Sequence, residues 1–168
     1  MTAIVENRSL PAMKVIGMSR HFFGLMAPQA NGHEVIPELW GQLFDALDDI
    51  EEFEFGWAVG LMSPVFGPDS KPGEMEYFAG LVIESEPESH PSLSVREVAG
   101  GQYAVCEHIG TLDDLGETTA WFYGEYLPAS QAAEREGYHL EVYDDRFDPE
   151  SDHSVVMICA PIEQSDNL

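Results

Sequence analysis

The sequence predicts an α+β fold of two β-α-β-β units, in which an antiparallel sheet carries helices packed on it. Three observations predict this fold. Apolar patterns occur in the order strand, helix, strand, strand, and that order repeats. The helix pattern of each half contains a tryptophan, and the two lie 81 positions apart, Trp40 and Trp121. A polar stretch over about 85–93 separates the halves. We expect pseudo-twofold symmetry between the units, with a ligand groove between the halves.

The first unit is expected over about residues 10–84. Residues 11–23 are apolar without strict alternation, as in a strand covered on both faces. Over 37–50, apolar side chains recur every three or four positions, which predicts a helix with Pro37 in its first turn. Residues 56–62 and 75–84 read as strands, and the Pro- and Gly-rich stretch 63–73 joins them as a hairpin.

The second unit is expected over about 94–163. Residues 93–109 hold two short strands, with Gly100 and Gly101 between them. Thr111, followed three positions later by Asp114, predicts a capping box for a helix over 112–127 that stops at Pro128. Strands follow over 138–144 and 153–162, and 164–168 is a short polar tail. The chain is therefore expected to form a single domain over 1–168.

The repeat extends beyond the tryptophans. At the same offset of 81, a glycine precedes the third element of each unit, an aromatic residue follows that glycine, and an alanine lies in the last strand: Gly56 and Gly137, Trp57 and Tyr138, Ala79 and Ala160. The alternative is chance alignment of common residue types. We interpret the offset as a duplicated β-α-β-β unit.

The charge excludes several classes of partner. The 168 residues include 31 acidic and 7 basic side chains, a net charge of −24. Such a chain is repelled by phosphate, so direct binding to nucleic acid or to an anionic membrane is not expected. No apolar run approaches the roughly 20 residues of a membrane span, and the N-terminus has no signal-peptide pattern. We expect a cytoplasmic protein.

Cofactor and metal chemistry have little support. Cys106 and Cys159 lie in apolar stretches and are expected to be free, buried thiols. His139 and Glu141 share a strand face, but further ligands at suitable spacing are missing and the other histidines are scattered. No nucleotide-binding or hydrolase-triad motif occurs. We therefore expect neither a metal nor a cofactor.

Three motifs of the second half occur in a specific order. They are G-Q-Y-A-V-C-E-H-I-G at 101–110, W-F-Y-G-E-Y-L-P at 121–128 and L-E-V-Y at 140–143. This series resembles the GyrI-like small-molecule-binding family. That family includes stand-alone gyrase-inhibitor-like proteins and the effector-binding domains of AraC-type and multidrug-responsive transcription regulators. The resemblance implies a stand-alone form here, because no helix-turn-helix pattern is present.

The resemblance also implies where a ligand would bind. In cation-binding members, an acidic residue on the strand after the second helix meets the positive charge of the ligand. The matching position is Glu141, and its first-half counterpart at the offset of 81 is Gly60. Alternation puts Glu141 and Tyr143 on one strand face, and we expect the other face to pack on the helices. Trp121, Trp40 and Tyr103 would add aromatic walls, although each could instead be a packing residue.

The leading hypothesis is a binding protein for small, apolar and possibly cationic molecules, acting in sequestration or sensing. A second hypothesis is a hydrolase of reactive electrophilic natural products, as some members of the resembled family are, with Glu141 as the general base. A third is an acidic protein that binds or inhibits a DNA-processing partner such as gyrase.

Overall fold

The computed structural model describes residues 2–164 in two compact units. The central unit is Met13–Val98, and the terminal unit combines the described parts of 1–12 and 99–168. The expected division placed residues 94–98 with the second half and had no strand before residue 10. In the structure, residues 94–98 pair within the central unit and residues 2–10 pair within the terminal unit. Most of the expected tail, 165–168, lies outside the described residues.

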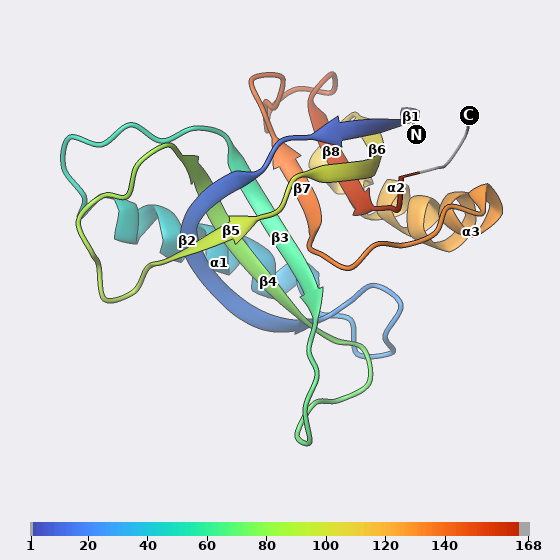
Figure 1. Ribbon diagram of the computed structural model, residues 1–168, viewed down its shortest axis with the longest axis horizontal. Coiled ribbons are helices and arrows are strands. Elements are labelled where there is room, and N and C mark those ends of the chain that lie inside the picture. Colours follow the sequence, from blue (N-terminus) through green and yellow to red (C-terminus); the bar gives the residue numbers. More distant parts are fainter. Residues whose placement is uncertain (1, 165–168) are drawn as a thin grey trace. The chain divides into compact units, whose positions relative to one another are not determined.

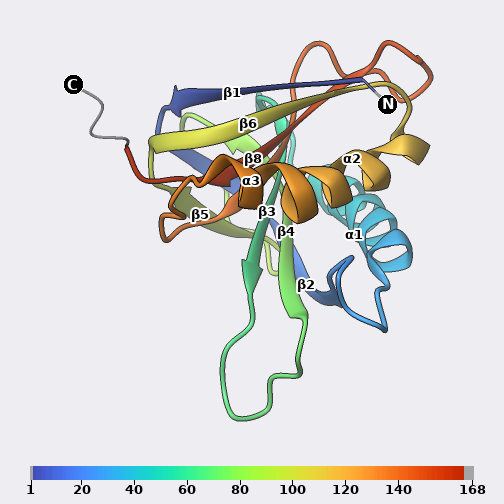
Figure 2. The same cartoon turned by 90° about the vertical axis from the view of Figure 1, so that its right-hand side faces the viewer.

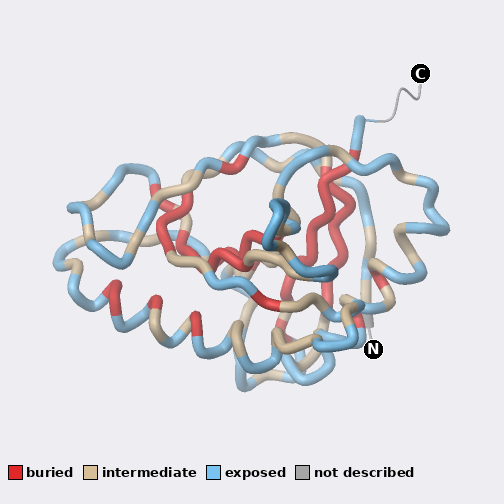
Figure 3. Tube along the Cα trace, turned by 90° about the horizontal axis from the view of Figure 1, so that it is seen from below, coloured by how far each residue is buried: buried red, intermediate tan, exposed pale blue. Residues whose placement is uncertain are grey.

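The central unit is a four-stranded antiparallel sheet covered on one face by a helix (Figure 1). Its elements are β2 (Met13–Phe23), α1 (Gly32–Leu47), β3 (Ala58–Pro64), β4 (Glu74–Ile83) and β5 (Ser94–Val98). The strands lie in the order β3-β4-β2-β5. One side of α1 is buried (Figure 3), and Leu39, Leu43 and Leu47 pack there against Phe22 and Tyr77.

The terminal unit has the same arrangement. Its strands are β1 (Thr2–Leu10), β6 (Gly101–Ile109), β7 (His139–Tyr143) and β8 (Val155–Pro161), in the order β7-β8-β6-β1. Its helical segment lies along one face of this sheet (Figure 2) and has four successive parts: 3₁₀ over Leu112–Asp114, α2 over Leu115–Trp121, a π-turn over Phe122–Tyr126 and α3 over Leu127–Ser130.

The α+β class with antiparallel sheets is confirmed. The order β-α-β-β runs over β2, α1, β3 and β4 in the central unit and over β6, the helical segment, β7 and β8 in the terminal unit, and β5 and β1 add a fourth strand to each sheet. The duplication itself stays a prediction. The offset of 81 equates Gly60 with Glu141 and Ala79 with Ala160. Gly60 lies opposite Ala79, but Glu141 lies opposite Ile158 rather than Ala160. The two hairpins therefore differ in register by two residues, a shift that keeps each side chain on the same face.

Helix α1 begins five residues earlier than expected. The carbonyl of Asn31 accepts hydrogen bonds from the N–H groups of Glu34 and Val35, at 3.0 and 3.1 Å, so the first turn forms there. The Asn31 side chain in turn accepts a 2.8 Å bond from the N–H of Phe23 at the end of β2. Pro37 consequently lies inside the helix rather than in its first turn.

The second helix departs from expectation at both ends. Thr111 makes no side-chain capping bond to the backbone, and its hydroxyl instead donates to the Asp114 carboxylate at 3.4 Å. The helical segment also passes Pro128 and reaches Ser130. Pro128 is tolerated because it lies in the first turn of α3, directly after the π-turn, and Gln131 ends the segment with a positive φ of 58°.

Both cysteines are free and buried, as expected. Burial raises the pKa of the Cys106 thiol to about 11 and that of Cys159 to about 12, so both stay protonated near neutral pH. Between residues 2 and 164, none of the helices combines the length and the apolar character that a membrane span requires.

Candidate ligand-binding site

Strand β7 presents two different faces. Leu140 and Val142 are buried, at 0% and 4% exposure, whereas His139, Glu141 and Tyr143 are partly exposed on the other face. The alternation expected from the sequence is therefore present. It brings two of the predicted site residues, Glu141 and Tyr143, to the same side of one strand.

The helices lie on the Glu141 face, and the expectation that they cover the Leu140 face is wrong. Glu141 lies directly opposite Ile158 on β8, and Ile158 packs beneath the helical segment with Phe122. Leu140 lies opposite Cys159, on the other side of the sheet. The pairing register, which the sequence pattern of one strand does not contain, decides which face the helices cover.

Two hydrogen bonds organise this face. The Tyr143 hydroxyl donates to Oε2 of Glu141 at 2.6 Å. Next along the strand, His139 Nδ1 and the Tyr123 hydroxyl, which comes from the helical segment, lie 2.9 Å apart. The ring of Phe147 packs edge-on against Tyr143, with centroids 4.9 Å apart. On this face of the strand, Glu141 therefore lies between His139 and Tyr143.

Burial sets the charge of the groups next to Glu141. It lowers the pKa of His139 despite the opposing effect of Glu134, so the imidazole is neutral near neutral pH. Burial also raises the pKa of Tyr123, helped by nearby groups that include Glu141 and Glu134. Both side chains are thus uncharged, and neither neutralises the Glu141 carboxylate.

The π-turn that carries Tyr123 was not expected from the sequence. A π-turn adds a residue to a helical turn and changes the direction of the side chains beyond it, and such turns are frequent at functional sites. Phe122, the first residue of the turn, is fully buried, while Tyr123 reaches His139. The aromatic run interrupted by Gly124 is the only sequence signal at this place, and it does not distinguish a π-turn from an α-helix.

The other predicted aromatic residues make packing contacts in the structure. Trp121 packs on the core of the terminal unit, with its ring 5.5 Å from that of Tyr126. Tyr103 is fully buried on the face opposite the helices, where the Arg135 guanidinium lies 4.9 Å from its ring centroid. In the central unit, Trp40 Nε1–H donates to the Tyr77 hydroxyl at 3.2 Å.

Tyr77 also explains why the central unit carries glycine where the terminal unit has Glu141. A Cβ at Gly60 would overlap the Tyr77 hydroxyl and ring, and Tyr77 is fully buried. The helix-side face of β3 is therefore filled by an aromatic residue at the point where β7 presents a carboxylate. The predicted acid occurs in one unit only.

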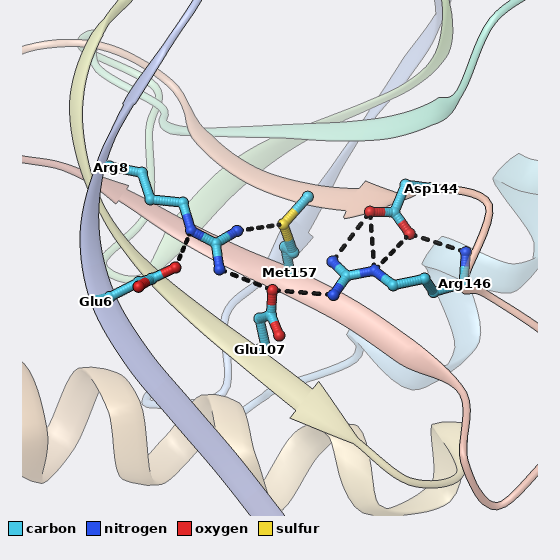
Figure 4. Close-up of polar contacts among 6 residues, drawn as sticks. All are labelled: Glu6, Arg8, Glu107, Asp144, Arg146 and Met157. Atoms are coloured by element: carbon cyan, nitrogen blue, oxygen red, sulfur yellow. Dashed lines mark hydrogen bonds and ion pairs between the residues drawn. The ribbon is translucent and has the colours of Figure 1, made fainter.

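A separate charge network lies on the other face of the terminal sheet (Figure 4). Oε1 of Glu107 accepts hydrogen bonds from Arg8 at 2.8 Å and from Arg146 at 3.0 Å. Arg146 also pairs with Asp144, and Arg8 with Glu6. Burial alone would raise the pKa of Glu107, but the two arginines outweigh it and the pKa is lowered. Two of the chain's few cations are thus engaged away from Glu141.

The chemistry available on the helix side is recognition by charge and aromatic contact. Over residues 2–164, no three His, Cys, Asp or Glu side chains gather in a way that could hold a metal ion. A carboxylate beside aromatic rings attracts an organic cation through its charge and through cation–π contact.

Comparisons with known proteins identify the family of this chain. The model of the family described as "GyrI-like small molecule binding domain" matches residues 5–163. The "Probable transcriptional regulator YgiV" of Escherichia coli strain K12 is 41% identical over 51 residues, which is 30% of this chain and 32% of that protein. The chain thus matches about a third of the length of this curated relative.

Two solved structures have a similar fold. The structure of SAV2435 bound to tetraphenylphosphonium aligns with a TM-score of 0.68 and 16% identity, over 95% of this chain and 94% of that one. The C-terminal domain of EcmrR aligns with a TM-score of 0.64 and 15% identity, over 98% of this chain and 100% of that one. With the domain match over nearly the whole sequence, the chain belongs to the GyrI-like small-molecule-binding domain family.

Proposed function

We propose that this protein binds small, apolar, cationic molecules and that Glu141 is the charge partner of the ligand. The observation that carries the proposal is the position of Glu141 on the helix-side face of β7, hydrogen-bonded by Tyr143. His139 and Tyr123 beside it are uncharged because they are buried. The structural relative bound to tetraphenylphosphonium, a lipophilic cation, supports the choice of ligand class.

Affinity and selectivity would have different sources. Burial of apolar ligand surface contributes about 25 cal/mol per Å² before the costs of association. A carboxylate next to aromatic rings adds charge selection, worth about 1–2 kcal/mol when the cation is desolvated. The net charge of −24 would further attract cations over a distance, an effect that weakens as salt rises. Such a protein can serve in sequestration or as the sensing part of a regulatory response.

The test is calorimetric titration of the full chain with tetraphenylphosphonium. Wild type is expected to bind, and Glu141→Gln is expected to bind about tenfold more weakly, since the substitution removes the charge with little change in shape. Glu136→Gln, which removes an exposed charge nearby in sequence, is the matched control and should bind as wild type does. Equal binding by wild type and Glu141→Gln would show that Glu141 is not the charge partner.

A further inference from the structure

A second site candidate lies on the helix side of the terminal unit, around a different carboxylate. A cavity of about 220 Å³ is lined by Tyr123, Leu127, Pro128, Ala132, Glu134, Ala160 and Ile162. Five of these seven residues are apolar, one is aromatic and one is acidic. The cavity is smaller than the 300–1,000 Å³ of typical sites for drug-sized ligands, so it fits a compact molecule.

The loop that follows α3 fixes the acidic side of this cavity. Glu134 forms a β-bridge with Ile162, and the N–H of Glu163 donates to the Ala133 carbonyl at 2.8 Å. Glu134 is exposed to solvent, while Ala160 and Ile162 are buried. Backbone pairing thus fixes the position of Glu134 at the edge of the apolar cavity, with its side chain exposed to solvent.

The two side chains on which the charge of Glu134 acts, His139 and Tyr123, carry no positive charge that would neutralise it. Its field reaches His139 and Tyr123, and both are uncharged because of burial. The adjacent cation, Arg135, is directed elsewhere: its guanidinium donates to the carbonyls of Ile162 and Gln102, at 3.3 and 3.1 Å, and lies over the ring of Tyr103.

We propose that this cavity binds a small alkylammonium cation between the Glu134 carboxylate and the ring of Tyr123. A quaternary ammonium ion needs no hydrogen-bond acceptor and presents an apolar surface, which matches the contacts offered by Leu127, Pro128 and Ala132. The negative carboxylate and the aromatic face supply the attraction for its charge. Neither Glu141 nor His139 lines this cavity, and Tyr123, which lines it, lies 2.9 Å from His139 through its hydroxyl.

This site goes beyond the proposed function, because it uses another carboxylate and takes a smaller ligand. The probe is tetraethylammonium, titrated into the full chain and followed by NMR chemical shifts of residues around the cavity. Glu134→Gln is expected to weaken its binding about fivefold. Ala132→Leu, which fills the cavity and keeps every charge, should abolish binding, while Glu136→Gln should leave it unchanged.

Tetraphenylphosphonium separates the two sites. Glu134→Gln and Ala132→Leu are expected to bind it as wild type does, whereas Glu141→Gln is expected to bind tetraethylammonium as wild type does. The inference is overturned if tetraethylammonium does not shift the cavity resonances, or if Glu134→Gln binds it as tightly as Glu136→Gln does. It is also overturned if Glu134→Gln and Glu141→Gln weaken both cations equally, because the two carboxylates would then share one site. Failure of tetraphenylphosphonium binding alone would count against the proposed function and not against this cavity.

Discussion

The Tyr143 hydroxyl donates a 2.6 Å hydrogen bond to Oε2 of Glu141, two residues earlier on the same strand. Residues two apart on a strand project from the same face, so the geometry of β7 itself brings the phenol and the carboxylate together. A hydrogen bond to an ionised acceptor is short and strong, and it holds the carboxylate in one orientation. Tyr143 thereby positions the group that we propose meets the cation.

Tyr143→Phe is expected to weaken tetraphenylphosphonium binding about fivefold, or ~1 kcal/mol, because the carboxylate loses the bond that orients it. Calorimetric titration measures the change. Tyr138→Phe removes the same hydroxyl just before β7 and should leave affinity unchanged. If Tyr143→Phe loses thermal stability but binds the cation as wild type does, Tyr143 has a structural role and does not position Glu141.

Gly60→Ala is expected to destabilise the central unit by about 2–3 kcal/mol, because the new methyl group overlaps Tyr77 in a close-packed core. Tyr77 cannot move easily, since it is fully buried and its hydroxyl accepts the bond from Trp40. Urea denaturation measures the loss. Gly41→Ala is the control: it lies in α1 with nothing within 4 Å of a new Cβ, and it should stabilise by about 0.5–1 kcal/mol. A Gly60→Ala protein as stable as wild type would contradict this packing.

The order of the elements follows from the sequence because each has its own periodicity. The stripe at three- and four-residue spacing in α1 and the Pro- and Gly-rich turn between β3 and β4 are local signals, and both elements are present. Strand β1 lacks such a signal. Its side chains are partly buried or exposed, with Glu6 and Asn7 exposed in succession, and it is a strand because it pairs along its length with β6, which lies about a hundred residues later.

The candidate site is predictable from the sequence only where it depends on local periodicity. The alternation around Glu141 is local, so its partnership with Tyr143 follows from spacing alone. Which face the helices cover depends on pairing register, and the contact between Tyr123 and His139 depends on a π-turn. Neither is encoded in the periodicity of one segment. The same holds for Tyr103, whose burial opposite the helices is set by the sheet rather than by its own strand.

His108→Leu is expected to destabilise the protein by about 2 kcal/mol. His108 is fully buried, with Nδ1 2.7 Å from the Thr118 hydroxyl and Nε2 2.8 Å from the Thr111 carbonyl, so it ties β6 to the start of the helical segment. Leucine fills the space but leaves both partners without their bond. Denaturation in urea gives the loss.

A double-mutant cycle with Thr118→Val tests whether the His108 bond is the cause. The two losses should not add, because each variant removes the same hydrogen bond. His153→Leu, at an exposed turn, should change stability by less than about 0.5 kcal/mol. Additive losses from His108→Leu and Thr118→Val would contradict the bond as their common origin.

Glu107→Gln is expected to cost about 1–2 kcal/mol near neutral pH, since Arg8 and Arg146 lose the carboxylate that pairs them. The value lies below that of a fully buried ion pair because both arginines are partly exposed.

The pKa of Glu107 is lowered on folding, so its contribution is present above the unfolded pKa of about 4.3 and is lost as pH falls through the folded value. Wild type and variant should therefore converge in strong acid, whereas a constant difference would exclude the charge as the cause. Glu150→Gln is the exposed control.

His139 is expected to make the terminal unit sensitive to mild acid, with the same proton balance as Glu107 but at higher pH. Burial lowers the pKa of His139 in the folded protein, so the unfolded chain binds its proton more readily. The free energy of unfolding should thus fall as pH drops below about 6.5, with a slope of at most about 1.4 kcal/mol per pH unit from this residue, and level off once the folded pKa is passed.

His139→Gln removes this proton while retaining a group that can bond the Tyr123 hydroxyl, so its stability should be less dependent on pH in that window. The measurement is urea denaturation of wild type and variant in steps between about pH 7 and pH 5, with His33→Gln, an exposed histidine, as the control. Carboxylates that titrate at lower pH contribute equally to all three proteins, so the difference between the curves isolates His139. A His139→Gln curve parallel to wild type would show that the imidazole takes up its proton as easily in the folded protein as in the unfolded chain. Burial beneath Tyr123 would then not keep it neutral.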